Sequence, residues 1–315
     1  MPLTTDQEVL KGAQESVKLL RAVAGEHPGY RPAHARGAIL KGTFTPTAEA
    51  ARLSSAPHFN QPTTDITARL SSATGFPTIP DTDPNANPRG FAIRFNLGEH
   101  VHTDIVAHST PFFPSRTGPE FNELFHTLIA SATTTESPTP LEKYLGSHPA
   151  ALAFVTAPKP SPESLASEPY YSVSAFKFIS KSGEQQYFRY RILPTMAVKT
   201  LSEEELKGKS PTYLFDELKT AIARGPLTFK LVAQLAEDED VTDDATVQWP
   251  EDRRIVDLGH IELKHLEPEE ESNKEQKKII FDPMPRVLGI EESSDPLLDF
   301  RAQVYLISGK QRRQA

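Results

Sequence analysis

An arginine and a tyrosine near the end of the chain have a spacing that favours a reactive phenolate. Residues 294–312 read SDPLLDFRAQVYLISGKQR, in which Arg301 and Tyr305 are four residues apart. On a helix this spacing puts both side chains on one face. A guanidinium beside a phenol favours loss of the phenolic proton, and the resulting tyrosinate is a ligand for ferric iron. Arg312, seven residues past Tyr305, returns to that face and could pair with a carboxylate.

The segment 294–312 has the signals of a single helix. Asp295 can cap its amino end, Pro296 stands at the first helical position, and no glycine follows before Gly309. Periodicity alone also fits an ordinary amphipathic helix, in which an arginine and a tyrosine at this spacing are surface and core residues. Other segments must decide between the two interpretations.

A histidine before an expected strand is a second candidate for chemistry. His34 lies in RPAHARG, residues 31–37, and a strand is expected over 38–44. An imidazole titrates near neutral pH, so it can take a proton from a bound molecule and return it to a departing group. A lone histidine beside a strand is nevertheless more often structural than catalytic.

Five short segments, in chain order, resemble the recurring motifs of haem catalases. RPAHARG resembles R-x-x-H-A-x-G, and the end of the strand ITARLS, residues 66–71, resembles R-F-S. NPRGFAIRF is similar to DPRGFAVKF, and DIVAHSTP is similar to DLVGNNTP. The fifth is the final segment, which resembles DP-x-L-x-x-R-x-x-x-Y with an arginine seven residues later. The resemblance runs from about residue 27 to residue 312, and the ordered set is far more specific than any one motif.

The resemblance implies a role for each candidate residue. Tyr305 would be the axial ligand of the haem iron, and His34 the acid–base residue on the opposite face of the porphyrin. Ser71 would orient the imidazole of His34. Arginines would neutralise the two haem propionates, because buried carboxylates need such partners. The cofactor contacts that the resemblance implies are Arg31, Arg69, Phe121, Arg301 and Arg312.

The chain departs from the family pattern at Ser109, where catalases have a catalytic asparagine. A serine hydroxyl reaches less far than an asparagine amide, so it leaves space above the iron and aligns a second peroxide less well. We therefore count Ser109 among the catalytic residues and expect a poor catalase and a better peroxidase. Neighbouring strand residues alternate between faces, so the sequence predicts that His108 points away from the site.

The predicted fold class is α+β. Strands with long insertions suit a closed antiparallel β-barrel with surrounding helices, as in catalases, with the haem between the barrel and the C-terminal helix 294–312. We expect one haem-binding domain over 1–315, beginning with a helix within 1–26. Residues 267–278 are dense in charge and are expected to form a solvated turn or loop. The clearest further strands are expected at 171–180, 184–193, 226–237 and 255–266.

Composition limits the classes of protein that the chain can represent. The formal net charge is −8 over 315 residues, with no basic stripe, so we expect no nucleic-acid partner. The chain has no cysteine, which excludes disulfides, thiolate-ligated haem and cysteine nucleophiles. No apolar run is long enough to span a bilayer, and MPLTTDQEV lacks the form of a secretion signal. The expectation is a cytoplasmic enzyme without a membrane partner.

The resemblance implies a peroxidase with haem b as cofactor. It would reduce hydrogen peroxide or organic hydroperoxides through an oxoferryl intermediate, use a small organic electron donor, and have weak catalase activity. The chain ends soon after the tyrosine helix, so it resembles the core-only, catalase-related members of the family, with a homodimer as one possible assembly. Two alternatives stay open: a haem-dependent lyase, isomerase or decarboxylase acting on fatty acids or their hydroperoxides, and a non-enzymatic haem-binding protein.

Overall fold

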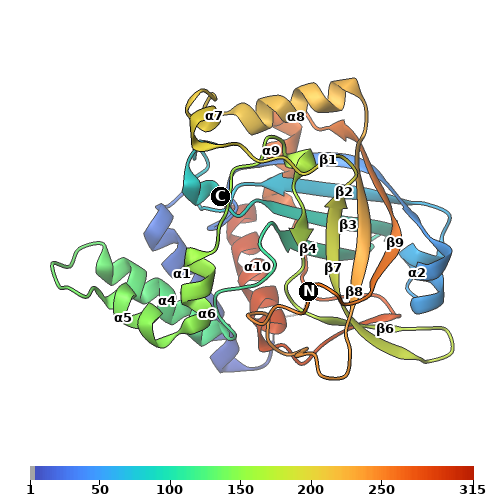
Figure 1. Ribbon diagram of the computed structural model, residues 1–315, viewed down its shortest axis with the longest axis horizontal. Coiled ribbons are helices and arrows are strands. Elements are labelled where there is room, and N and C mark those ends of the chain that lie inside the picture. Colours follow the sequence, from blue (N-terminus) through green and yellow to red (C-terminus); the bar gives the residue numbers. More distant parts are fainter. Residues whose placement is uncertain (1–3) are drawn as a thin grey trace.

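Antiparallel strands form the centre of the molecule, which a computed structural model describes from residue 4 to residue 315 (Figure 1). Residues 1–3, the start of the expected segment 1–26, lie outside the described residues. Eight strands of the described part follow one another in the order β7-β5-β4-β3-β2-β1-β9-β8, and β8 pairs with β7 again. The sheet therefore closes on itself, and the predicted closed antiparallel barrel is confirmed.

The strands have the following bounds. They are β1 Gly37–Pro46, β2 Thr64–Ser71, β3 Gly90–Gly98, β4 Val101–His108, β5 Tyr170–Tyr171, β6 Phe176–Ile179, β7 Gln185–Pro194, β8 Leu227–Leu235, β9 Ile255–Leu266 and β10 Ile290–Glu292. The single strand expected over 171–180 is two strands, because its halves pair differently. β5 joins β4 to β7 within the ring, whereas β6 pairs with β7 and then with β10 outside it.

Aromatic side chains from several strands fill the barrel. Phe44 of β1 packs edge-on against Phe95 of β3, with ring centroids 5.2 Å apart, and Phe91 packs in the same way against Phe229 of β8. All four are fully buried. Each fully buried aromatic side chain contributes about 2–3 kcal/mol through removal of apolar surface from water. These side chains fill the interior of the barrel, and the helices pack on its outside.

Helices cover the barrel unevenly (Figure 1). Three of them, α1 Gln7–Ala24, α4 Gly118–Ser131 and α10 Pro296–Gln314, pack against one another beside the barrel. The cap predicted for the last helix is present, since Asp295 accepts a hydrogen bond from the backbone N–H of Leu297 at 2.9 Å. The other helices are α2 Ala48–Leu53, α3 Pro57–Asn60, α5 Pro140–Ser147, α6 Pro149–Thr156, α7 Glu203–Lys207, α8 Tyr213–Arg224 and α9 Glu269–Lys278.

The charge-dense stretch 267–278 was expected to be a loop, and this expectation was wrong. It contains α9, whose charges are ordered along the helix. Glutamates 269–271 occupy the first turn and Lys277 and Lys278 the last, so both ends complement the helix dipole. The inner face buries Ser272 and Gln276, which are polar, and a hydrophobic pattern was therefore absent from the sequence. None of the described helices is both long and apolar enough to cross a membrane.

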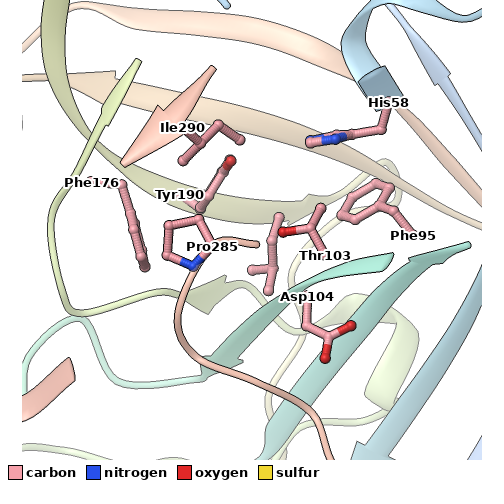
Figure 2. A pocket seen from close by; sticks show the side chains of 9 residues that line it. His58, Phe95, Thr103, Asp104, Phe176, Tyr190, Pro285 and Ile290 are labelled. Atoms are coloured by element: carbon pink, nitrogen blue, oxygen red, sulfur yellow. The ribbon is translucent and has the colours of Figure 1, made fainter. Parts of the chain in front are cut away.

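A small cavity lies among side chains of α3, β3, β4 and β7 (Figure 2). His58 of α3 borders it, with its ring tilted against that of Phe95 at a centroid distance of 4.5 Å, and both ring nitrogens of this fully buried residue lack a hydrogen-bond partner within residues 4–315. Thr103 and Tyr190 also line the cavity. None of the site residues predicted from the sequence borders this cavity. We therefore expect His58 to affect the stability of the fold and not the chemistry of the site.

Replacement of His58 by leucine is expected to reduce the loss of stability in acid. Burial lowers the pKa of His58 to about 3, so the unfolded chain, with an ordinary pKa of about 6.5, binds the proton more readily. The free energy of unfolding therefore falls as pH drops from about 6.5 towards 3, by up to about 1.4 kcal/mol per pH unit from this group.

Urea unfolding at about pH 7.5 and about pH 4.5 checks this expectation. H58L should lose less stability between the two pH values than the unaltered protein. The exposed His260 of β9 is the control, and H260L should behave like the unaltered protein. Equal losses in H58L and H260L would contradict the assignment.

Candidate active site

Helix α10 holds the tyrosine and the first arginine of the site. Arg301 Nη2 donates a hydrogen bond to the hydroxyl oxygen of Tyr305 over 3.1 Å, and its guanidinium carbon lies 5.6 Å from the ring centroid. The two side chains share one face of the helix, as the spacing predicted. Arg301 thus places a charged hydrogen-bond donor at the oxygen of Tyr305. The pair is thus prepared to ligate an electrophilic metal through oxygen.

Three arginines from distant segments meet near the end of α9. Arg31 and Arg312 both donate to the carbonyl oxygen of Ile279, at 3.1 and 2.9 Å. Arg69 Nε donates to the side-chain oxygen of Gln276 at 2.8 Å, and Arg31 also donates to the backbone oxygen of Gln276 at 3.1 Å. The unexpected helix α9 therefore supplies the neutral acceptors that hold the arginine cluster, defined here as Arg31, Arg69 and Arg312.

The arginine cluster carries positive charge without an internal counterion. Within residues 4–315, none of its guanidiniums forms an ion pair with an aspartate or glutamate. Burial, with Arg69 and Arg312 nearby, lowers the pKa of Arg31 well below its ordinary range, and burial and Arg312 lower the pKa of Arg69 to about 9. Arg312 is 3% exposed, and its Nε has no hydrogen-bond partner in the described part of the chain. Such a cluster fits an anionic group, in particular one with carboxylates.

His34 lies close to this cluster and is held by two neighbours. Its ring Nδ1 is 3.2 Å from Ser71 Oγ, and its backbone oxygen accepts a hydrogen bond from Arg69 Nη2 at 2.7 Å. Burial, followed by the charges of Arg69, Arg31 and Arg301, lowers the pKa of His34 to about 3. The imidazole is therefore neutral at neutral pH, which is the form that can accept a proton. The predicted pairing of His34 with Ser71 is present.

Gly90 explains why the His34 ring fits against the sheet. The residue pairs with Ser71 of β2 on one side and with His108 of β4 on the other. A Cβ atom at Gly90 would lie only 2.6 Å from Ser71 Oγ and 2.8 Å from His34 Nδ1. The glycine of the NPRGF motif thus leaves the space that the imidazole occupies.

The structure corrects the orientation that was predicted for His108. Because residues directly opposite one another in a sheet point to the same face, His108, Gly90 and Ser71 share the face that His34 covers. Burial, followed by the charges of His34 and Arg301, lowers the pKa of His108 to about 3. The expectation that His108 points away was wrong. Side chains do alternate between the two faces of β4, but the pairing of His108 with Gly90 puts His108 on the face of the site.

Ser109 does not direct its hydroxyl towards His34. Its Oγ accepts a hydrogen bond from the backbone N–H of Arg89 at 3.0 Å. Burial raises the pKa of Glu168 to about 7, and a hydrogen bond from Ser109 is the largest effect that opposes this rise. The Ser109 hydroxyl is therefore engaged with Arg89 and Glu168, which removes the basis for placing it in the catalytic set.

Phe121 comes from α4 and lies beyond His108. Its ring stacks on Phe113 with a centroid distance of 5.7 Å, and Phe113 lies 6.4 Å from the ring of His108. Ring contacts therefore connect Phe121, through Phe113, to His108. Sequence reasoning missed His108 and Gln276. Counting strand register from Gly90 could have found the first, whereas Gln276 gave no local signal.

Comparison with known proteins places the chain in a family. The catalase family model matches residues 15–314. The chain belongs to the catalase family. It is an oxidoreductase by this membership, and the family implies a haem cofactor. The residues of the site fit that cofactor. Tyr305, with Arg301, would hold its iron. The arginine cluster would pair with its propionates, and the neutral His34 would lie on the face of the porphyrin where a peroxide binds.

Similar curated proteins cover nearly the whole chain. A "Catalase-related peroxidase" of Mycolicibacterium paratuberculosis is 34% identical over 95% of this chain and 94% of its own length. A protein of the same description from Synechococcus elongatus is 30% identical, over 91% of this chain and 85% of its own.

Solved structures agree on the fold. A fungal catalase superposes with a TM-score of 0.79 at 25% identity, and catalase A from Saccharomyces cerevisiae with 0.78 at 24%. Each alignment covers 91% of this chain, which spans 60% and 62% of the length of the two structures. These matches show the barrel and its helices, not the activity.

Replacement of Arg301 by leucine is expected to weaken haem binding in acid. The oxygen of Tyr305 would lose its charged hydrogen bond from Arg301, which would weaken its bond to the iron. Absorption spectra of the haem-loaded protein, recorded from neutral to acidic pH, should show loss of the bound form at a higher pH in R301L. Arg313, an exposed arginine of the same helix, is the control, and identical pH profiles for R301L and R313L would contradict the role.

Proposed function

We propose that this chain is a haem b peroxidase that reduces hydrogen peroxide or organic hydroperoxides with electrons from a small organic donor, and that it is only a weak catalase. The haem lies between the barrel and α10 in this proposal, and residues 1–315 act as one haem-binding unit. The observation that carries it is the arginine cluster close to the Arg301–Tyr305 pair, whose three buried or half-buried cations have no counterion among the described residues. The matching relatives described as catalase-related peroxidases support the same conclusion.

Each residue has a defined task in this proposal. The phenolate of Tyr305 would hold the iron, and the arginine cluster would neutralise the two propionates. His34, kept neutral by burial and oriented by Ser71, takes a proton from one oxygen of the peroxide and returns it to the oxygen that leaves as water or alcohol. When bound, the haem supplies the iron chemistry that breaks the oxygen–oxygen bond.

The balance between peroxidase and catalase activity is directly measurable. Reduction of one hydroperoxide consumes two electrons and two protons, and these electrons come either from the organic donor or from a second hydrogen peroxide. We expect faster oxidation of a one-electron donor dye than release of oxygen. Rapid oxygen release with no dye oxidation would contradict the proposal.

A second assay tests the fatty-acid alternative. The haem-loaded protein is given a fatty acid hydroperoxide without any reductant, and the products are separated. We expect little turnover without the donor and the corresponding alcohol with it. Rapid donor-independent conversion to rearranged or cleaved products would instead favour a lyase or isomerase.

A further inference from the structure

The imidazole of His108 has a fixed tautomer. Its Nδ1 faces the backbone N–H of Thr110 at 3.2 Å, and a backbone amide can only donate. Nδ1 must therefore be the accepting, unprotonated nitrogen, and a neutral ring then carries its proton on Nε2. Burial and nearby positive charge keep the ring neutral, because they lower the pKa of His108 to about 3.

The proton on Nε2 has no partner in the described protein. Nε2 is buried and makes no hydrogen bond, although an unpaired buried donor is costly. The ring stands on the face of the sheet that His34 covers, one strand away from Gly90, over which the His34 ring lies. An N–H donor thus lies on the same sheet face as the acid–base residue, and none of the residues 4–315 accepts its hydrogen bond.

We propose that His108 is the second catalytic residue of the site, whose Nε2–H donates a hydrogen bond to the oxygen atom of a peroxide or anion bound opposite Tyr305. The inference rests on the proposed haem function and deepens it. An asparagine amide at this end of β4 would offer the same kind of N–H donor. In this chain the imidazole of His108 supplies that donor, and the hydroxyl of Ser109 does not. His34 handles the proton, whereas His108 holds and orients the oxygen.

Fluoride binding to the ferric haem-loaded protein tests this inference without measuring turnover. Fluoride is a small anion that a hydrogen-bond donor stabilises, so its dissociation constant reports the donor directly. We compare the unaltered protein with H108L, which lacks the donor, and H108N, which keeps an N–H group. S109N is the matched control at the neighbouring position.

H108L should raise the fluoride dissociation constant by about tenfold or more, as expected for loss of one hydrogen bond to a charged group. H108N should recover at least part of the affinity, and S109N should leave it unchanged. Thermal unfolding of each haem-loaded variant separates this effect from loss of the fold.

The opposite results overturn the inference. An unchanged dissociation constant in a folded H108L excludes the donor role, and a change in S109N that exceeds the change in H108L returns the role to Ser109. Either result leaves the proposed haem function intact. An unaltered protein that takes up no haem overturns both.

Discussion

Tyr305→Phe should remove most of the peroxidase activity and the spectrum of a tyrosinate-bound ferric haem while the protein stays folded. The substitution deletes one oxygen atom, and that atom is the only one of the Arg301–Tyr305 pair that can ligate iron. The arginine cluster is unaffected, so propionate contacts persist and part of the haem affinity remains. Absorption spectra after haem titration and steady-state dye oxidation measure the two effects.

The control for this substitution is Tyr187, which lies on β7, away from α10, and is 36% exposed. Y187F should keep the spectrum and the activity of the unaltered protein. A Y305F variant with an unchanged spectrum and full turnover would show that Tyr305 is not the iron ligand.

His34→Ala should slow peroxide reduction by roughly 10²- to 10⁴-fold, the usual effect of removing a general acid–base. Haem should still bind, because neither the phenolate nor the arginine cluster changes. Ser71→Ala should have a smaller effect, since it removes only the hydroxyl that lies 3.2 Å from the His34 ring. The rate constants come from steady-state kinetics at saturating donor.

H260A is the control for this prediction, because His260 is an exposed histidine of β9. It should retain full activity. A loss smaller than about twofold in H34A would remove the case for general acid–base catalysis and favour a non-enzymatic haem-binding protein.

Local sequence signals predicted the parts of the site that depend on local geometry. Arg301 and Tyr305 lie on one helical turn, and the 3.6-residue period puts them together whatever the rest of the chain does. The barrel was also predictable, because the segments that resemble catalases include its strands in order. Ser71 and His34 come together because β1 and β2 are paired neighbours in sequence and in the sheet.

The features that the sequence did not reveal depend on contacts between distant segments. The face occupied by His108 is set by its register with Gly90, and a shift of one residue would exchange the roles of His108 and Ser109. Helix α9 buries polar residues, so its sequence has no apolar stripe from which the helix could be predicted. Its end gathers Arg31 and Arg312 at one carbonyl oxygen, a contact that spans most of the chain.

The absorption spectrum of the purified protein titrated with haem tests the central claim most directly. The account predicts saturation at one haem per chain and the spectrum of a ferric haem with an oxygen-donor tyrosinate ligand, which differs readily from that of a histidine-ligated haem. The absence of saturable binding, or a histidine-ligated spectrum that persists in Y305F, would contradict it.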